Sequence, residues 1–373
     1  MLQSYQSTSR FDYIDSLRGF AILFVIMAHS ANATQMNGTL RAVTDGGLMG
    51  VHLFFMISAF TIFHMLTKHV QEEQNPVRNF FIRRFFRLVP VYWFGILFYI
   101  AVLGLLPRSQ WWHYPVHLTL TNALFPRTQI FLAVPGGWSI SVEMLFYLSV
   151  PLWFKWVRSL RQAWIFMLVS VFVLPLVTFA LRQWMDPLLL GIQPYLINYY
   201  WERFPLNSLG SFSFGILLFF LLKDERVTLL IRNKNVGLLM IGFVTLVLPL
   251  LGMFDYIYPL KPHFYCIFFM LLALALAHNP HQFFVNPATI FIGRISYSMY
   301  LFHFAVLIGW IKWVPKHMPY FSVAQPEFFL ITYVVVLLGT VFLALGGYLC
   351  IERPAIEASK RLIFRLERKS AMN

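Results

Sequence analysis

Two chemically reactive side chains lie in the first apolar run, "DSLRGFAILFVIMAHS" at residues 15–30. Arg18 is a permanent cation, whereas His29 is an imidazole that accepts or donates a proton near neutral pH. Eleven residues of α-helix rotate by about 1,100°, or three turns and about 20°, and advance by about 16 Å. A helix here would place both on one face, with Arg18 near one membrane boundary and His29 in the opposite half. A snorkelling arginine with a buried structural histidine is the simpler alternative.

A carboxylate with polar neighbours occurs in "GGWSISVEMLFYLSV". Ser139, Glu143 and Tyr147 recur at i, i+4 and i+8, so a helix would present them as one stripe. By depth, Glu143 and His29 share one half of the membrane. A buried carboxylate beside an imidazole raises the basicity of the imidazole. The pattern therefore predicts that His29 is a general base held in place by Glu143. Alternatively, Glu143 pairs with an arginine and only holds the helices together.

A second histidine lies in "GRISYSMYLFHFAVL". Ser296, Tyr300 and His303 are spaced i, i+4 and i+7, so we expect them to line one helix face. By helix rise, His303 lies at a depth similar to that of His29. We expect a shared site, with a structural role for His303 as the alternative.

Basic residues gather before the third apolar run, in "NFFIRRFFRLVPVYW". Arg84 and Arg87 are almost one turn apart and share a face, next to Arg83. Guanidinium groups bind phosphate oxygens in bidentate fashion, so a phosphate-rich ligand is one interpretation. Anchoring to lipid headgroups is the other. Glu352, in "IERP", is expected to pair with one of these arginines in a structural role.

The elements that must position these groups are membrane helices. The 373 residues are 59% hydrophobic and 12% charged, against about 25% charged in soluble domains. We predict an all-α, polytopic membrane protein with one domain over 1–373, spans within about 14–354 and a basic tail at 355–373. Ten spans are expected, at 14–31, 47–67, 89–106, 137–155, 163–181, 205–222, 236–252, 263–278, 290–311 and 327–350.

The basic residues also predict the orientation of the chain. With ten spans and the N-terminus inside, 21 of the 29 lysines and arginines lie on the cytoplasmic side. Both termini are therefore expected in the cytoplasm, and the first helix is expected to remain as an anchor. The +14 net charge is explained by this bias, and no nucleic-acid-binding motif is present.

Several smaller features limit the alternatives. The segment 115–125 is too short to span a membrane and is expected to be interfacial or re-entrant. Small residues Ser58 and Ala59 in "GVHLFFMISAF" predict close helix packing. Two cysteines give no disulfide framework, and the spacing of His29, Glu143 and His303 has no metal signature.

Together these segments resemble the acyltransferase-3 family of integral membrane acyltransferases. The matching pieces span residues 12–354: Arg18 with His29, "GVHLFFMISAF", "RRFFRLVPVYW", "WSISVEMLFYL", "GRISYSMYLFHF" and "IERP". Ala59 departs from the glycine that many members have after the serine. The sequence has no hydrolase-like segment after the last span, so we expect a stand-alone enzyme of the O-antigen-modifying type.

The resemblance implies transfer of an acyl group, commonly acetyl, from cytoplasmic acyl-coenzyme A to a hydroxyl of a cell-surface carbohydrate, such as lipopolysaccharide O-antigen or exopolysaccharide. The expected location is the inner membrane of a bacterium, with no metal cofactor. Arg18, Arg84 and Arg87 would bind the coenzyme A phosphates. His29 would act as general base oriented by Glu143, or as a nucleophile. The expected acceptor-binding residues are Trp138, Ser139, Tyr147, Ser296, Tyr300 and His303.

Two other classes of function fit the same residues. A secondary transporter or flippase would use the buried histidine and glutamate as a proton relay. A membrane scaffold would not depend on the imidazole of His29 at all.

Overall fold

The protein is a bundle of helices in a computed structural model that describes residues 11–104, 113–130, 133–189, 191–251, 260–317 and 326–372. No strand occurs in these ranges, which agrees with the predicted all-α class. The first half contains α1 (Asp12–Ala33), α2 (Gly38–Asp45), α3 (Gly50–Glu72), α4 (Pro76–Leu103), α5 (His113–Leu118), α6 (Pro126–Ile130), α7 (Trp138–Trp156), α8 (Leu160–Leu168) and α9 (Leu174–Met185). The second half contains α10 (Pro194–Glu202), α11 (Pro205–Leu221), α12 (Glu225–Arg232), α13 (Lys234–Leu250), α14 (Lys261–His278), α15 (Pro287–Arg294), α16 (Ser296–His317), α17 (Pro326–Gly347) and α18 (Arg353–Met372).

Eight helical segments of the described chain are long and apolar enough to cross a membrane. A ninth candidate is α12 with α13, two helices that meet at an angle of 85°. The protein is therefore a polytopic membrane protein, but the predicted ten spans are not all confirmed. The remaining predicted span, 137–155, forms the 19-residue helix α7, whose serines, glutamate and lysine make it less apolar.

Two predicted spans are interrupted. The span 290–311 is divided at Ile295 between α15 and α16. Asn286 caps α15 through a reciprocal capping box with Thr289, which starts a separate short helix within the polar end of the run. The span 163–181 contains a π-helical turn at Val169–Val173 but continues through it.

The central helices pack through small residues. A Cβ on Gly215 of α11 would lie 1.9 Å from the carbonyl oxygen of Met56 and 2.9 Å from the Cβ of Ala59, both on α3. The predicted close packing around Ser58 and Ala59 is thus confirmed. A Cβ on Gly293 of α15 would similarly lie 1.7 Å from the carbonyl oxygen of Asp15 on α1. These contacts bring the backbones of α1, α3, α11 and α15 close together, as small residues allow in membrane bundles.

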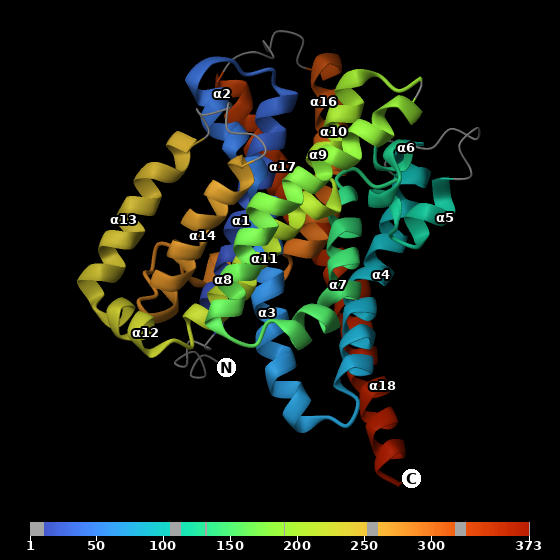
Figure 1. Cartoon of the computed structure of the whole chain (residues 1–373). Helices are drawn as coiled ribbons and strands as arrows, with labels where there is room; N and C mark the ends of the chain where they lie inside the picture. Colours follow the sequence, from blue (N-terminus) through green and yellow to red (C-terminus); the bar gives the residue numbers. More distant parts are fainter. Residues whose placement is uncertain are drawn as a thin grey trace, which may run out of the picture.

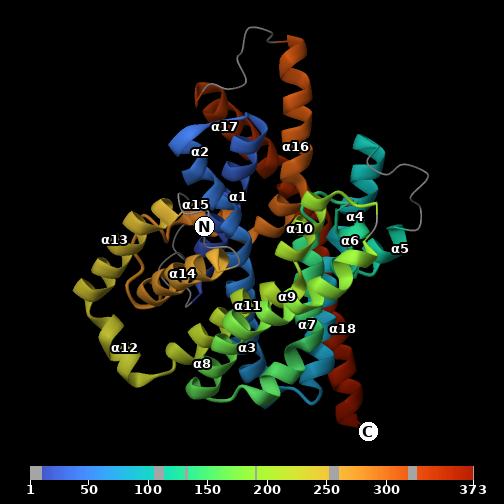
Figure 2. The same cartoon turned by 45° about the horizontal axis from the view of Figure 1, so that its top comes forward.

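The peripheral elements flank this centre in both views (Figures 1 and 2). Helices α12 and α13 lie beside α14 at one edge, and α18 runs along α4 at another before projecting from the bundle. The helix through α17 and α18 covers Glu327–Ser370, 44 residues or about 66 Å, so it extends well beyond a hydrocarbon core of about 30 Å. The segment 115–125, predicted not to span, contains the end of the short helix α5 and a 3-10 turn at Asn122–Leu124.

Candidate active site

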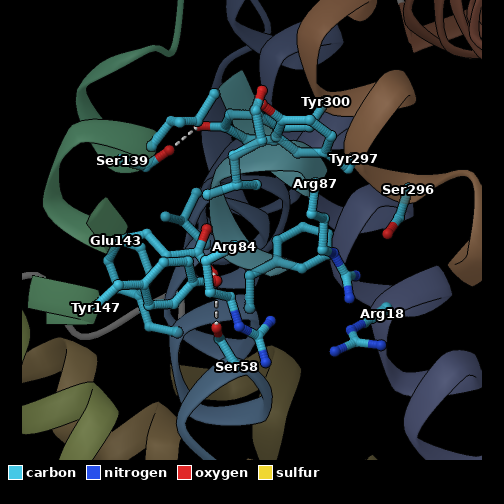
Figure 3. Close-up of a pocket in the computed structure, with 15 residues that line it drawn as sticks. Arg18, Ser58, Arg84, Arg87, Ser139, Glu143, Tyr147, Ser296, Tyr297 and Tyr300 are labelled. Atoms are coloured by element: carbon cyan, nitrogen blue, oxygen red, sulfur yellow. Dashed lines mark hydrogen bonds between the residues drawn. The ribbon is translucent and has the colours of Figure 1, made fainter. Parts of the chain in front are cut away.

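A cavity between α1, α3, α4, α7 and α16 contains about 610 Å³ of empty space, including its open mouth. Its polar lining brings together predicted residues from four separate helices (Figure 3). They are Arg18, Arg84, Arg87, Ser139, Glu143, Tyr147, Ser296 and Tyr300, and three residues that the sequence did not single out for the site, Ser58, Phe54 and Tyr297, join them. The expected shared face of α7 and the first two residues of that of α16 therefore converge on one space, whereas His303 does not line it.

Three arginines face this cavity. Arg84 is buried, with 5% of its surface exposed, and its guanidinium lies 5.2 Å from the ring centre of Tyr147. Arg18 pairs with Asp15 at 3.3 Å and donates to the hydroxyl of Thr61 at 3.3 Å. No hydrogen bond or ion pair joins Arg87 to another described residue. Arg83 points away from the cavity and instead pairs with Glu73.

The charge of the cavity is unbalanced. Its lining contains three guanidinium groups and a single carboxylate, Glu143. The positive charges of Arg84 and Arg87 act unfavourably on Arg18, because like charges repel strongly where water is scarce. An anionic ligand would relieve this repulsion. Unbalanced burial of this kind is costly unless a ligand pairs the charges.

Glu143 belongs to this arginine end of the cavity. The hydroxyl of Tyr147 donates to Oε1 of Glu143 at 2.5 Å, so the hydroxyl of Ser58, 2.9 Å from Tyr147, must donate to the tyrosine oxygen. Arg84 also interacts electrostatically with Glu143. The expected pairing of Glu143 with His29 is not present: the carboxylate is held by the residue one turn away on its own helix.

Tyr300 closes the opposite end of the cavity (Figure 3). Its hydroxyl accepts from Ser139 at 2.8 Å and donates to the carbonyl oxygen of Gly136 at 3.1 Å. Gly136 has a φ of +79°, and a Cβ there would lie 3.2 Å from the tyrosine oxygen, so glycine suits both the turn and the contact. The α7 end and α16 are thus joined above the arginines.

His29 lies behind Tyr300 and does not line the cavity. Its ring stacks on that of His303 with centroids 5.3 Å apart, and it also contacts Phe304. His303 in turn contacts Tyr300 with centroids 5.6 Å apart. The expected common depth of the two histidines is confirmed, whereas the cavity that Arg18 lines does not extend to His29, which contacts His303 instead.

The surroundings of His303 define its tautomer. Nδ1 lies 2.7 Å from the carbonyl oxygen of Tyr300, which can only accept, so Nδ1 carries the hydrogen. Nε2 of the neutral ring is then an acceptor, and it is buried with no partner among the described residues. The histidine pair therefore offers an unused basic nitrogen inside the fold.

Helix α4 is held against α16, which keeps the arginines in register with Tyr300. Tyr297 donates to the carbonyl oxygen of Leu88 at 2.7 Å, and Tyr99 donates to that of Leu301 at 2.7 Å. Glu352 is buried and accepts from Ser298 at 2.6 Å. Its expected arginine ion pair is absent within the described chain, although the charges of Arg87 and Arg18 act on it from further away.

The sequence of this chain also resembles known proteins. Residues 11–348 match the family model of the acyltransferase domain of acyltransferase-3 proteins. The chain belongs to the acyltransferase-3 family. The predicted resemblance is thereby confirmed over nearly the whole described structure.

Three relatives of this acyltransferase-3 chain illustrate the match. It is 26% identical over 348 residues to the protein SACOL0978 of Staphylococcus aureus strain COL, and 24% identical over 350 residues to O-acetyltransferase OatA of S. aureus strain NCTC 8325 / PS 47. Each alignment covers 79% of this chain and 50% of the relative. Acyltransferase MdmB of Streptomyces mycarofaciens is 30% identical over 169 residues, 42% of either chain.

The acyltransferase-3 chain thus spans about half the length of the two S. aureus relatives, and its match to MdmB covers 42% of that protein. No solved structure matches it. Within the described ranges, no three histidine, cysteine, aspartate or glutamate side chains form a group that could hold a metal ion.

Proposed function

We propose that the protein is a membrane O-acyltransferase that moves an acetyl group from acetyl-coenzyme A to a hydroxyl of a cell-surface carbohydrate, such as an O-antigen or exopolysaccharide. The observation that carries this proposal is the cavity lined by Arg18, Arg84 and Arg87, with a histidine pair directly behind its far end. The family membership and the printed names of OatA and MdmB support acyl transfer as the chemistry.

The arginines suit the donor. Coenzyme A carries several phosphate charges on one end and a thioester on the other, joined by a thin flexible arm. Guanidinium forks bind phosphate oxygens in bidentate fashion, and the excess positive charge of the cavity favours a polyanion. The rise of about 16 Å from Arg18 to His29 is comparable to the length of the extended arm.

His29 is proposed as the general base. The acceptor hydroxyl gives its proton to the imidazole as its oxygen attacks the thioester carbonyl. The C–S bond then breaks, and the departing thiolate takes that proton to leave as coenzyme A. Such proton transfer typically accelerates a reaction by about 10²–10⁴-fold. Transient acylation of His29 is the variant with a covalent intermediate.

Glu143 receives a different role from the one expected from the sequence. Its contact with Tyr147 and its electrostatic interaction with Arg84 support a function in positioning the arginine under the phosphates. His303, stacked on His29, takes over as the residue that orients the base. Because the cavity does not extend to the histidines and Tyr300 of its lining contacts His303, the proposal includes a movement of this ring when the thioester arrives.

The positions of the basic residues support the direction of transfer. The arginine end of the cavity lies where α1 begins, the end expected in the cytoplasm from the lysine and arginine distribution. The donor would therefore enter from the cytoplasm and the acceptor from the outer side. We also place the protein in the inner membrane of a bacterium, because the relatives named above are bacterial proteins.

The test uses the full chain in lipid nanodiscs with acetyl-coenzyme A labelled in the acetyl group. Release of free thiol together with labelled carbohydrate supports the proposal, and the same membranes with His29→Gln provide the control. Mass spectrometry of surface glycans from cells with and without the gene identifies the acceptor. Movement of a solute without thioester cleavage would instead indicate a transporter, and unaltered glycan acetylation in the His29→Gln cells would reject the assignment.

A further inference from the structure

A second cavity lies between α9, α10 and the start of α11, and it shares no lining residue with the cavity of the three arginines. Helices α9 and α10 lie side by side in both views (Figures 1 and 2). The cavity contains about 820 Å³ of empty space, including its open mouth, and ligand pockets typically measure about 300–1,000 Å³. Five of its eight lining residues are polar: Thr178, Arg182, Asn198, Glu202 and Asn207. We call this cavity the outer groove.

The outer groove lies on the side from which the acceptor is proposed to come. The end of α9 and the starts of α7 and α11 fall on the outer side in the orientation expected from the lysines and arginines. Glu202 of the groove is followed by Arg203, whose guanidinium carbon lies 5.2 Å from the ring centre of Trp138. Ser139, the next residue of α7, donates to Tyr300. Contacts therefore join the outer groove to the Tyr300 end of the arginine cavity.

Side-chain hydrogen bonds fix the walls of the outer groove. Asp186, directly after α9, accepts from Nε of Arg182 at 2.9 Å and from the indole nitrogen of Trp201 on α10 at 2.7 Å. Arg182 also donates to Asn198 on α10. Asn207 of α11 donates to the carbonyl oxygen of Trp201 at 2.8 Å. The three helices are thus held around the empty space, and a ligand would meet a preformed site.

Polar groups of the lining remain for a ligand. Oγ1 of Thr178 and Oδ1 of Asn207 are buried, and neither has a hydrogen-bond partner within the described chain. The carboxylate of Glu202 lies 3.8 Å from its ion-pair partner, and 47% of this side chain is exposed. The groove therefore offers hydroxyl, amide, carboxylate and guanidinium groups in one space. Such a set suits a ligand that both donates and accepts hydrogen bonds.

Carbohydrates have this chemistry. A sugar hydroxyl donates one hydrogen bond and accepts others, whereas the C–H faces of the ring are apolar and pack on aromatic side chains. Phe179, which is 62% exposed, and Pro175 supply an apolar part of the lining. A phosphate is disfavoured, because Arg182 is already paired with Asp186 and Glu202 adds a further negative charge. A lipid acyl chain would leave the polar lining without partners, which is unfavourable.

We propose that the outer groove binds the carbohydrate acceptor. The inference rests on the proposed function and names the place where its second substrate is held. Sugar residues next to the reacting one would form hydrogen bonds with Asn198 and Glu202, while the reacting hydroxyl extends past Trp138 toward Tyr300. Contacts of this kind hold a substrate in position without taking part in the bond changes.

The test separates binding of the acceptor from the chemistry of the donor. The double substitution Asn198→Ala with Glu202→Ala removes two exposed polar groups of the lining. Mass spectrometry measures O-acetylation of surface glycans in cells that express it. The same chain in nanodiscs is given acetyl-coenzyme A and hydroxylamine, an acceptor too small to need the groove, and acetyl hydroxamate is quantified. We expect glycan acetylation to fall by about 10- to 100-fold, as for two lost hydrogen bonds, and hydroxamate formation to change by less than about threefold.

Gln183→Ala with Gln193→Ala is the matched control. Both glutamines are exposed polar residues of the same region, on α9 and directly before α10, and neither lines the outer groove. Both activities should stay at the level of the parent. Asn198→Trp is a second variant, which fills the mouth of the groove and keeps Glu202, and it should show the same selective loss. Thermal unfolding of each variant shows whether the fold is retained.

Three results would overturn the inference. Normal glycan acetylation by the folded variants would show that the acceptor does not use the outer groove, which would then be a contact for lipid. A parallel fall in hydroxamate formation would show that the groove acts on catalysis or folding. An equal loss in the glutamine control would reduce the effect to any change of this surface. If the unmodified protein cleaves no acetyl-coenzyme A, the proposed donor fails as well, whereas an active parent with fully active variants rejects the groove alone.

Discussion

Replacing Arg84 by methionine tests the phosphate-binding cavity most directly. The side chain is 5% exposed and faces the cavity, and its Nε forms no hydrogen bond with another described residue. Methionine fills similar apolar volume over Tyr147 but cannot bind phosphate. The substitution also removes a repulsive neighbour of Arg18, so we expect the free protein to remain folded.

The magnitude follows from the hydrogen bonds that a buried guanidinium makes to a charged group, about 1.5–3 kcal/mol. A loss of about 1.4 kcal/mol corresponds to tenfold, so kcat/KM for acetyl-coenzyme A should fall by about 10- to 100-fold. The assay is the initial rate of thiol release in nanodiscs. S-acetylpantetheine has the same thioester without phosphate, and its kcat/KM should change by less than about threefold.

Arg83→Met is the neighbouring control, because Arg83 pairs with Glu73 and does not line the cavity. The assignment of Arg84 to phosphate is wrong if Arg83→Met shows the same loss. It is equally wrong if S-acetylpantetheine and acetyl-coenzyme A lose activity in parallel, since the arginine would then act on the thioester or on folding.

Three further outcomes are expected. His29→Gln should lower thioester cleavage by about 10²–10⁴-fold while its unfolding temperature stays near that of the parent, and retained activity would exclude His29 as the base. Gly215→Ala should destabilise the bundle by about 1–3 kcal/mol, because the new Cβ would meet the carbonyl oxygen of Met56. Gly242→Ala is the control, because the space around Gly242 is open, and it should not destabilise the protein. Equal unfolding temperatures of the two variants would contradict this packing. Glu367→Ala should release α18 to proteases, because the carboxylate accepts from the backbone of Gln74 and from Arg78, and unchanged cleavage would show that apolar packing on α4 suffices.

Local periodicity predicted which side chains of a helix share one face and line the cavity. The i, i+4 and i+8 spacing placed Ser139, Glu143 and Tyr147 on one face, and all three line the cavity. The spacing of Ser296 and Tyr300 was equally reliable. Residues one turn apart on a helix are neighbours whatever the tertiary fold, so such faces depend only on helix geometry.

Contacts between helices were less predictable from depth alone. Glu143 and His29 were expected to meet because both lie in one half of the membrane, but depth does not define the direction in which a side chain faces. The partner on the same helix, Tyr147, is always within reach, whereas His29 would require a particular rotation of α1 against α7. His303 satisfied that requirement instead, through α16.

Links between helices were the least informative part of the sequence. Arg203 counted only as one of the few basic residues on the expected outer side, where no spacing rule applies. Its place beside Trp138 depends on how α10 and α11 bring their connection back over α7. The break at Ile295 could not be predicted for a similar reason. The capping residue of α15, Asn286, lies several residues before the break, and the apolar sequence continues across Ile295 without a signal that one helix ends there.

In the proposed reaction, negative charge develops at a place different from the one where the phosphates of the donor bind. Phosphates must be held where the donor enters, yet the transition state develops its negative charge at the carbonyl, near His29. The arginines of the cavity cannot serve both places, because helix rise puts His29 about 16 Å from Arg18 and charge stabilisation falls with distance. In this proposal Tyr300, which is hydrogen-bonded to Ser139 and Gly136 and contacts His303, moves aside when the thioester arrives. The same ring would then limit the access of water to the thioester, which favours transfer over hydrolysis.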